Sequence, residues 1–187
     1  CPPKTARYRS SQKLYPVFKR NNRSKYDPFI ATLKTAVVGN VIDLAAEVSF
    51  DLHDAIMSVF NTPFAHDDTE ALRNSLHHAK RILYIGDNAW EHLFDALAIQ
   101  SLQKLYPDLV FTYMVRGNPI INDVTMKEAV EPGMEEICFL MNSGVPNPGF
   151  VYELASPEAQ AVFDTAYLVI AKGMGNYECM TPYRRQN

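Results

Sequence analysis

Four short runs of β-branched, aliphatic and aromatic residues alternate with helical patterns in the second half of the chain, and this alternation limits the possible folds most. The runs cover residues 82–85, 109–115, 137–141 and 167–171. Apolar residues recur at helical spacing between them, most extensively over 89–105. A repeated strand–helix–strand order predicts an α/β fold whose mainly parallel sheet is covered by helices on both faces.

The first half of the chain has a helical pattern instead. Apolar residues at a spacing of four predict a helix over 28–38 that is interrupted at Gly39, and further helices are expected over 51–60 and 67–80. We therefore expect four segments. They are a basic arm (1–26), a helical segment that packs on the core (27–80), the sheet-containing core (81–178) and a short tail (179–187).

Composition excludes several classes of protein. The 187 residues carry a formal net charge of −3, which argues against a dedicated nucleic-acid binder, because such a protein needs an excess of Lys and Arg to neutralise phosphates. No apolar run approaches the roughly 20 residues of a membrane span, and no secretory leader is recognisable. Three widely spaced cysteines form neither a disulfide framework nor a zinc site. A cytoplasmic setting is expected, and the start on Cys1 suggests a piece of a longer protein.

Small and polar residues follow every expected strand, and ligands of open parallel sheets bind at the carboxyl ends of the strands. Asp87, Asn88 and Asp123 offer two carboxylates and an amide oxygen there, the donors that Mg²⁺ or Mn²⁺ prefers. A helix beginning near Ala89 would direct free N–H groups toward an anion at the same place.

Basic and hydroxyl side chains complete this edge of the expected sheet. Lys172, between strand and glycines, can supply a positive charge to a phosphoryl group, and Arg116 and Ser143 also follow strands. Each residue also has a plainer interpretation. The aspartates are suited to cap helices, Lys172 to lie on the surface, and Arg116 to pair with a carboxylate. Their convergence on one edge favours a site for a phosphorylated small molecule.

Four motifs resemble those of the metal-dependent damage-control phosphatases, the family catalogued as domain of unknown function 89. They are Gly-Asn-Val-Ile-Asp at 39–43, Tyr-Ile-Gly-Asp-Asn-Ala at 84–89, Arg-Gly-Asn-Pro-Ile-Ile-Asn-Asp-Val-Thr at 116–125 and Ala-Lys-Gly-Met-Gly-Asn-Tyr-Glu at 171–178. They occur in the order of the family, and the resemblance covers about residues 27–178.

The resemblance implies a Rossmann-like three-layer α/β/α core and a phosphatase that hydrolyses phosphate monoesters of small metabolites, such as sugar phosphates or damaged cofactor phosphates. It implies a divalent metal, Mn²⁺ or Mg²⁺ with Co²⁺ or Ni²⁺ as further choices, held by Asp87, Asn88 and Asp123. Lys172 would hold the phosphate and Asn40 would line the same pocket. The expected catalytic set is Asp87, Lys172 and Asn40, and the expected substrate contacts are Asn40, Arg116, Ser143 and Lys172.

Two alternatives remain at this point. Trp90 stands where the family usually has a small residue, and both ends of the family fold are shortened, so a catalytically impaired protein that binds phosphorylated metabolites is one alternative. The other is a Rossmann-like methyltransferase, which the missing Gly-rich strand-to-helix turn disfavours.

Overall fold

A four-stranded parallel sheet forms the centre of the protein in a computed structural model that describes residues 26–47, 52–130 and 133–183. The strands are β1 (Arg81–Ile85), β2 (Val110–Val115), β3 (Phe139–Asn142) and β4 (Leu168–Ala171), in the spatial order β3-β2-β1-β4. Every neighbouring pair is parallel. The α/β class and the parallel sheet predicted from the sequence are confirmed.

Alternation along the central strands builds a separate core on each face of the sheet. Ile82 and Tyr84 of β1 belong to one buried cluster, whereas Leu83 and Ile85 belong to the other. Successive side chains of a strand point to opposite faces, so both faces need cover when every residue is apolar.

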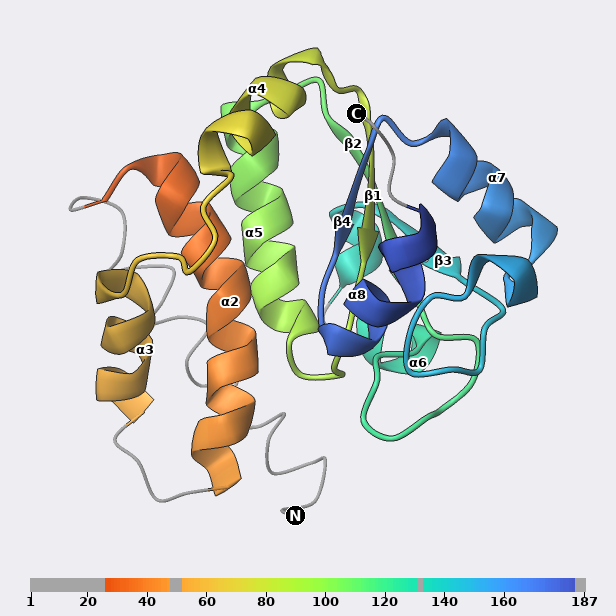
Figure 1. Ribbon diagram of the computed structural model, residues 1–187, viewed down its shortest axis with the longest axis horizontal. Helices are drawn as coiled ribbons and strands as arrows, with labels where there is room; N and C mark the ends of the chain where they lie inside the picture. The colour runs from red at the N-terminus through yellow and green to blue at the C-terminus, as the bar shows by residue number, and fades with distance from the viewer. Residues whose placement is uncertain (1–25, 48–51, 131–132, 184–187) are drawn as a thin grey trace.

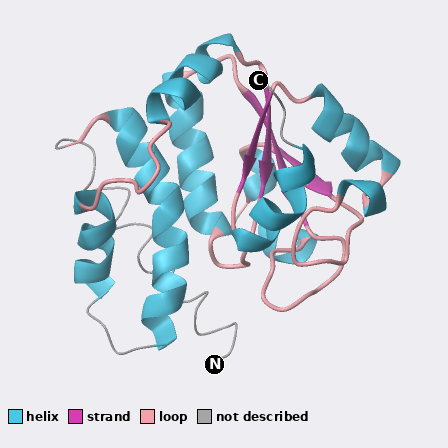
Figure 2. Cartoon of the chain, in the orientation of Figure 1, coloured by secondary structure: helices cyan, strands magenta, loops and turns pink. Residues whose placement is uncertain are grey.

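Helices provide this cover in three layers (Figures 1 and 2). On one face lie α5 (His92–Leu105) and α6 (Met126–Val130), and on the other lie α7 (Pro157–Thr165) and α8 (Met174–Met180). Three short 3₁₀ turns join these elements, at Met134–Glu136, Tyr152–Leu154 and Thr181–Tyr183.

The preceding helices pack around α5 (Figure 1), and Phe29 and Leu76 from them also join the buried cluster that contains Ile82 and Tyr84 of β1. They are α2 (Pro28–Glu47), α3 (Leu52–Asn61) and α4 (Thr69–His78). A third apolar cluster joins α2 and α3 to α5 and contains Val38, Ile56, Phe60, Leu93, Phe94 and Leu97. The helical segment therefore contacts the sheet-containing part of the chain through α5. The expected basic arm lies almost wholly outside the described residues.

Three element boundaries differ from the sequence prediction. Helix α2 continues through Gly39, where the helix passes so close to Glu91 that a Cβ atom would lie 3.2 Å from that residue. Helix α5 begins at His92, since the amide of Ala89 donates to Asn122 instead of starting a helix. Residues 174–180 form α8 where a polar loop was expected.

Candidate functional site

The carboxyl ends of β1, β2 and β4 converge on one edge of the sheet, and backbone pairing brings the predicted acidic residues together there. Asn88 and Asp123 form an isolated antiparallel bridge, and the amide of Val124 donates to the carbonyl of Asp87 at 2.8 Å. The loop after β2 therefore folds back beside the loop after β1. This pairing explains how residues 36 positions apart in the sequence reach one site.

The surroundings of Asp87 strongly perturb its carboxylate. Its side chain is 17% exposed, and burial together with the charges of Glu91 and Asp123 raises its pKa to about 7, although Arg116 and Lys172 act in the opposite direction. Negative charge is therefore in excess around Asp87. A cation bound there would relieve this excess.

Arg116 is buried against Asp123 rather than placed on the surface. Its Nε donates to Asp123 Oδ2 at 2.7 Å, its Nη2 donates to the carbonyl of Pro148 at 3.0 Å, and Nη2 lies 4.0 Å from Asp87 Oδ1. The carboxylate of Asp123 is thus held by an ion pair. At the start of α6, the amide and the hydroxyl of Thr125 both donate to the carboxylate of Glu128.

Lys172 reaches the site from the end of β4 and bridges two buried carboxylates. Its Nζ donates to Glu91 Oε2 at 2.5 Å and to Asp95 Oδ1 at 3.0 Å. Burial lowers the pKa of Lys172, but the negative charges of Asp95 and Glu91 outweigh that effect and hold the pKa above its usual value. Lys172 is therefore a charged, anchored group and not a solvated surface lysine.

The composition of the site fits a divalent cation. Four carboxylates (Asp87, Glu91, Asp95 and Asp123) face two cations (Arg116 and Lys172), which leaves two negative charges uncompensated when all are ionised. Among the described residues, no group of three or more His, Cys, Asp or Glu side chains is arranged to hold a metal alone. Magnesium-type ions commonly need only one or two carboxylates and complete their shell with water and phosphate.

Asn88 adds a neutral oxygen to this donor set. Its amide nitrogen donates to Asp87 Oδ2 at 3.2 Å and to Glu91 Oε1 at 2.8 Å. Both N–H groups are used, and its Oδ1 is then the atom suited to a hard cation. The chemistry of Asp87, Asn88 and Asp123 therefore agrees with the predicted metal site.

Asn40 and Ser143 come from other elements, α2 and the turn after β3. Asn40 is exposed on α2, next to Gly39, whose backbone approaches Glu91. The hydroxyl of Ser143 is buried and accepts from the amide of Val145 at 3.2 Å, within its own turn. The roles predicted for both residues stay predictions.

The start of α5 does not provide the expected anion site. The amide of Ala89 donates to Asn122 at 2.8 Å, and that of Glu91 donates to Asn88 at 3.1 Å. Glu91 itself occupies the N-cap position, so a carboxylate already stands at the positive end of the helix. These contacts disfavour the predicted binding of phosphate at this helix terminus. Trp90, in the same turn, is 2% exposed.

Sequence reasoning missed the residues beneath the site. Glu91 and Asp95 are one helical turn apart, and Asp95 interrupts an otherwise apolar helix face, which is the signal that was available. Asn176 was also missed. It is fully buried, and its amide nitrogen donates to the carbonyls of Gly86 at 3.2 Å and of Lys172 at 2.6 Å, which fixes the ends of β1 and β4.

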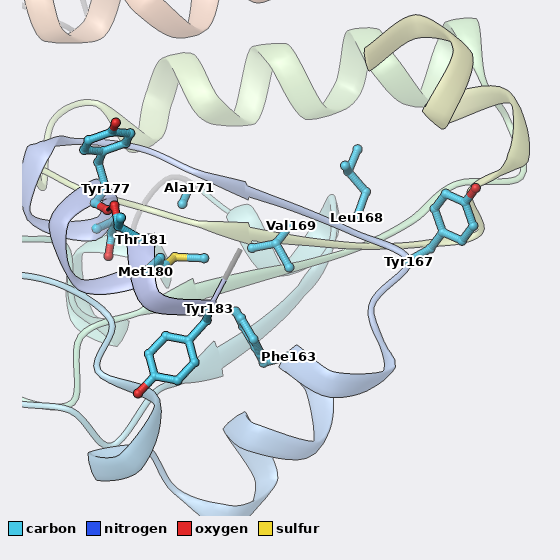
Figure 3. Close-up of a pocket in the computed structure, with 10 residues that line it drawn as sticks. Phe163, Tyr167, Leu168, Val169, Ala171, Tyr177, Met180, Thr181 and Tyr183 are labelled. Carbon is cyan, nitrogen blue, oxygen red and sulfur yellow. Dashed lines mark hydrogen bonds between the residues drawn. The ribbon is translucent and has the colours of Figure 1, made fainter. Parts of the chain in front are cut away.

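A cavity of about 390 Å³ runs along the outer side of β4 (Figure 3). Tyr167 lies at one end and Tyr177 at the other, and the side chain of Met180 in α8 extends toward Val169 of β4 between them. All residues that line it are uncharged. The charged chemistry of the sheet edge is thus separate from this cavity, although Asn176 borders both.

Comparisons with known proteins agree with the motifs. The sequence model of the damage-control phosphatase ARMT1-like domain matches residues 3–187. An uncharacterized protein of Methanocaldococcus jannaschii is 37% identical over 79% of the chain and 49% of its own length. A protein named damage-control phosphatase from Pyrococcus horikoshii is 33% identical over 91% of the chain and 58% of its own length.

A solved structure shares the fold. The crystal structure of a DUF89 family protein from Pyrococcus horikoshii superposes with a TM-score of 0.86 at 29% identity, over 97% of this chain and 63% of that protein. The chain thus spans about half to three fifths of the relatives that it matches. Within the described residues, no helix is both long and apolar enough to cross a bilayer. The cytoplasmic setting stays a prediction.

Proposed function

We propose, because the chain belongs to the damage-control phosphatase ARMT1-like domain family, that it hydrolyses phosphate monoesters of small metabolites with the help of a divalent cation. Sugar phosphates and damaged cofactor phosphates are the substrate class. The observation that carries the proposal is the meeting of Asp87, Asn88 and Asp123 with Lys172 at one edge of the sheet. These groups supply the oxygens for a cation and a donor for a phosphoryl group.

Asp87, Asn88 and Asp123 would hold the cation, which we propose to be Mn²⁺ or Mg²⁺, with Co²⁺ or Ni²⁺ as further choices. When bound, it would supply Lewis-acid stabilisation of the charge on the phosphoryl oxygens. Arg116 orients this set, because its ion pair with Asp123 fixes the position of that carboxylate.

Lys172 would bind the phosphoryl group directly. An ammonium group has three N–H donors, and Glu91 and Asp95 occupy two of them. The third donates to a phosphoryl oxygen and stabilises the charge that spreads over that group during transfer. Asn40, exposed on α2 near Glu91, would contact the rest of the substrate.

Phosphate release from an aryl phosphate, with and without Mn²⁺, tests the proposal. We expect the wild-type chain to release phosphate only with Mn²⁺, and Asp123→Asn to reduce the rate roughly 100-fold or more. Asp108→Asn is the matched control, because Asp108 is exposed in the loop before β2, at the opposite end of the strands. Equal rates in wild type and Asp123→Asn would contradict the proposal.

A further inference from the structure

We propose that Asp95 is a positioning residue, held by two tyrosine hydroxyls, that directs the ammonium group of Lys172 toward the phosphoryl group of the substrate. The inference rests on the proposed phosphatase function and extends it to residues below the site. Asp95 is fully buried in α5 and contacts Lys172 at 3.0 Å.

Both oxygens of Asp95 are fixed by separate strands. The hydroxyl of Tyr84 on β1 donates to Oδ1 at 2.7 Å, and the hydroxyl of Tyr113 on β2 donates to Oδ2 at 2.8 Å. The two rings stack with centroids 5.5 Å apart. A carboxylate that is held by two strands and by its own helix has little freedom to move. It therefore fixes the position of the Lys172 ammonium group rigidly.

Gly86 leaves room for Tyr113, one of the two tyrosines that hold Asp95; we call Asp95 with Tyr84 and Tyr113 the anchor. A Cβ atom at Gly86 would lie 2.3 Å from the hydroxyl oxygen of Tyr113 and 2.7 Å from its ring carbon Cζ. The tyrosine reaches Asp95 by passing directly under the backbone at the end of β1. The glycine of the Gly-Asp-Asn motif is thus required by the anchor as well as by the loop that carries Asp87.

The anchor orients the N–H groups of Lys172 and does not add to the positive charge at the site. Two carboxylates more than compensate the single positive charge of Lys172, so net attraction cannot be its main contribution to phosphate binding. Fixing two of the three N–H groups leaves the last with a defined direction. An unanchored lysine would instead lose rotamer entropy on binding, and small misplacements of a reacting group reduce rates strongly.

A double-mutant cycle between Asp95 and Lys172 tests the inference in the Mn²⁺-loaded chain. The variants are Asp95→Asn, Lys172→Met and the pair, and the readouts are kcat on an aryl phosphate, the inhibition constant of inorganic phosphate, and the melting temperature. We expect Asp95→Asn to lower kcat about tenfold or more and to weaken phosphate binding. In the Lys172→Met background it should change neither quantity further.

The melting temperature should move in the opposite sense in the two backgrounds. Asp95→Asn alone removes the negative charge that pairs with Lys172 and should lower the melting temperature, whereas in Lys172→Met it removes a buried charge that has lost its cation and should raise it. Tyr113→Phe, which deletes one donor to Asp95, should produce a smaller loss of kcat. Asp108→Asn, exposed at the other end of the strands, should change nothing.

Two results would overturn the inference. The first is a wild-type kcat in Asp95→Asn. The second is an equal fold-loss of kcat on adding Asp95→Asn to wild type and to Lys172→Met, which would mean that Asp95 acts without Lys172. A wild-type chain that neither binds phosphate nor releases it with Mn²⁺ would instead remove the proposed function, and this inference with it.

Discussion

At the scale of single residues, Asp87 connects the charge of the site to the stability of the fold. Its folded pKa of about 7 exceeds the usual value of 3.8, so the folded state binds a proton more tightly than the unfolded state. In metal-free protein, the contribution of Asp87 to the free energy of unfolding is fully present below about pH 4 and is lost as the pH rises through 7. The total loss is on the order of 4 kcal/mol. Asp87→Asn should abolish that loss.

Urea unfolding of wild type and Asp87→Asn between pH 4 and 8, in the presence of a chelator, measures this difference. Comparison with the variant is needed because His92 contributes with the opposite sign. Burial lowers the pKa of His92 to about 4, so His92 binds a proton more weakly in the folded state than in the unfolded state. The effect of His92 alone is therefore to raise the free energy of unfolding as the pH increases from about 4 toward 6.5. Parallel stability curves for wild type and Asp87→Asn would contradict the prediction.

Gly173 is a second residue where backbone and site meet. It has a φ of +84°, and a Cβ atom there would lie 2.1 Å from Asp87 Oδ2. We predict that Gly173→Ala destabilises the fold by more than about 2 kcal/mol and also weakens Mn²⁺ binding, because the new methyl group displaces the carboxylate.

Gly133 provides the matched control. It also has a positive φ, of +78°, but the nearest atom to an added Cβ there is 3.6 Å away. Gly133→Ala should therefore cost roughly 1–2 kcal/mol of stability and leave Mn²⁺ affinity unchanged. Calorimetric titration with Mn²⁺ and chemical unfolding of both variants separate strain from displacement of Asp87. Equal Mn²⁺ affinity in both would count against a tight contact at Asp87.

At the scale of secondary-structure elements, one buried lysine joins two helices. Lys34 of α2 is 6% exposed, and its Nζ donates to the carbonyls of Val59 at 2.9 Å, Phe60 at 3.0 Å and Thr62, at the end of α3. A helix C-terminus leaves carbonyl groups without intrahelical partners and carries partial negative charge, so an ammonium group satisfies both needs.

Lys34→Met should therefore destabilise the chain by roughly 2–4 kcal/mol, because the carbonyls at the end of α3 would stay buried without donors. Hydrogen exchange should show the largest loss of protection in α3, while β1 and β2 change only by the global amount. Lys104→Met, exposed in the last turn of α5, is the control. Uniform loss across the chain would show that α3 does not open separately.

At the scale of the whole molecule, the uncompensated charge of the site predicts that a divalent cation stabilises the fold. With Mn²⁺ at 100 times its Kd, linkage gives about 2.7 kcal/mol, a rise in Tm of roughly 5–10 °C for a chain of this length. A chelator should reverse the rise. A doubly substituted chain with Asp87→Asn and Asp123→Asn should show no rise, and an equal rise there would place the cation elsewhere.

The sequence by itself determined the class of fold and brought the candidate residues to one edge of the sheet. Alternating apolar patterns are local, and a continuous apolar run such as 82–85 favours a strand that is buried on both faces of a parallel sheet. Asp87, Asp123 and Lys172 follow strands, and the carboxyl ends of parallel strands necessarily meet. These predictions needed no knowledge of which strands are neighbours.

The partners of each charged group were decided only by the tertiary structure. Lys172 contacts Glu91 and Asp95, which are 81 and 77 positions away, and no local pattern specifies contacts over such separations. The start of α5 depended likewise on a hydrogen bond from Ala89 to Asn122, in a different loop. Helix and strand propensities act over a few neighbouring residues. The partner of a buried charged side chain depends instead on which groups the packed helices and strands place beside it.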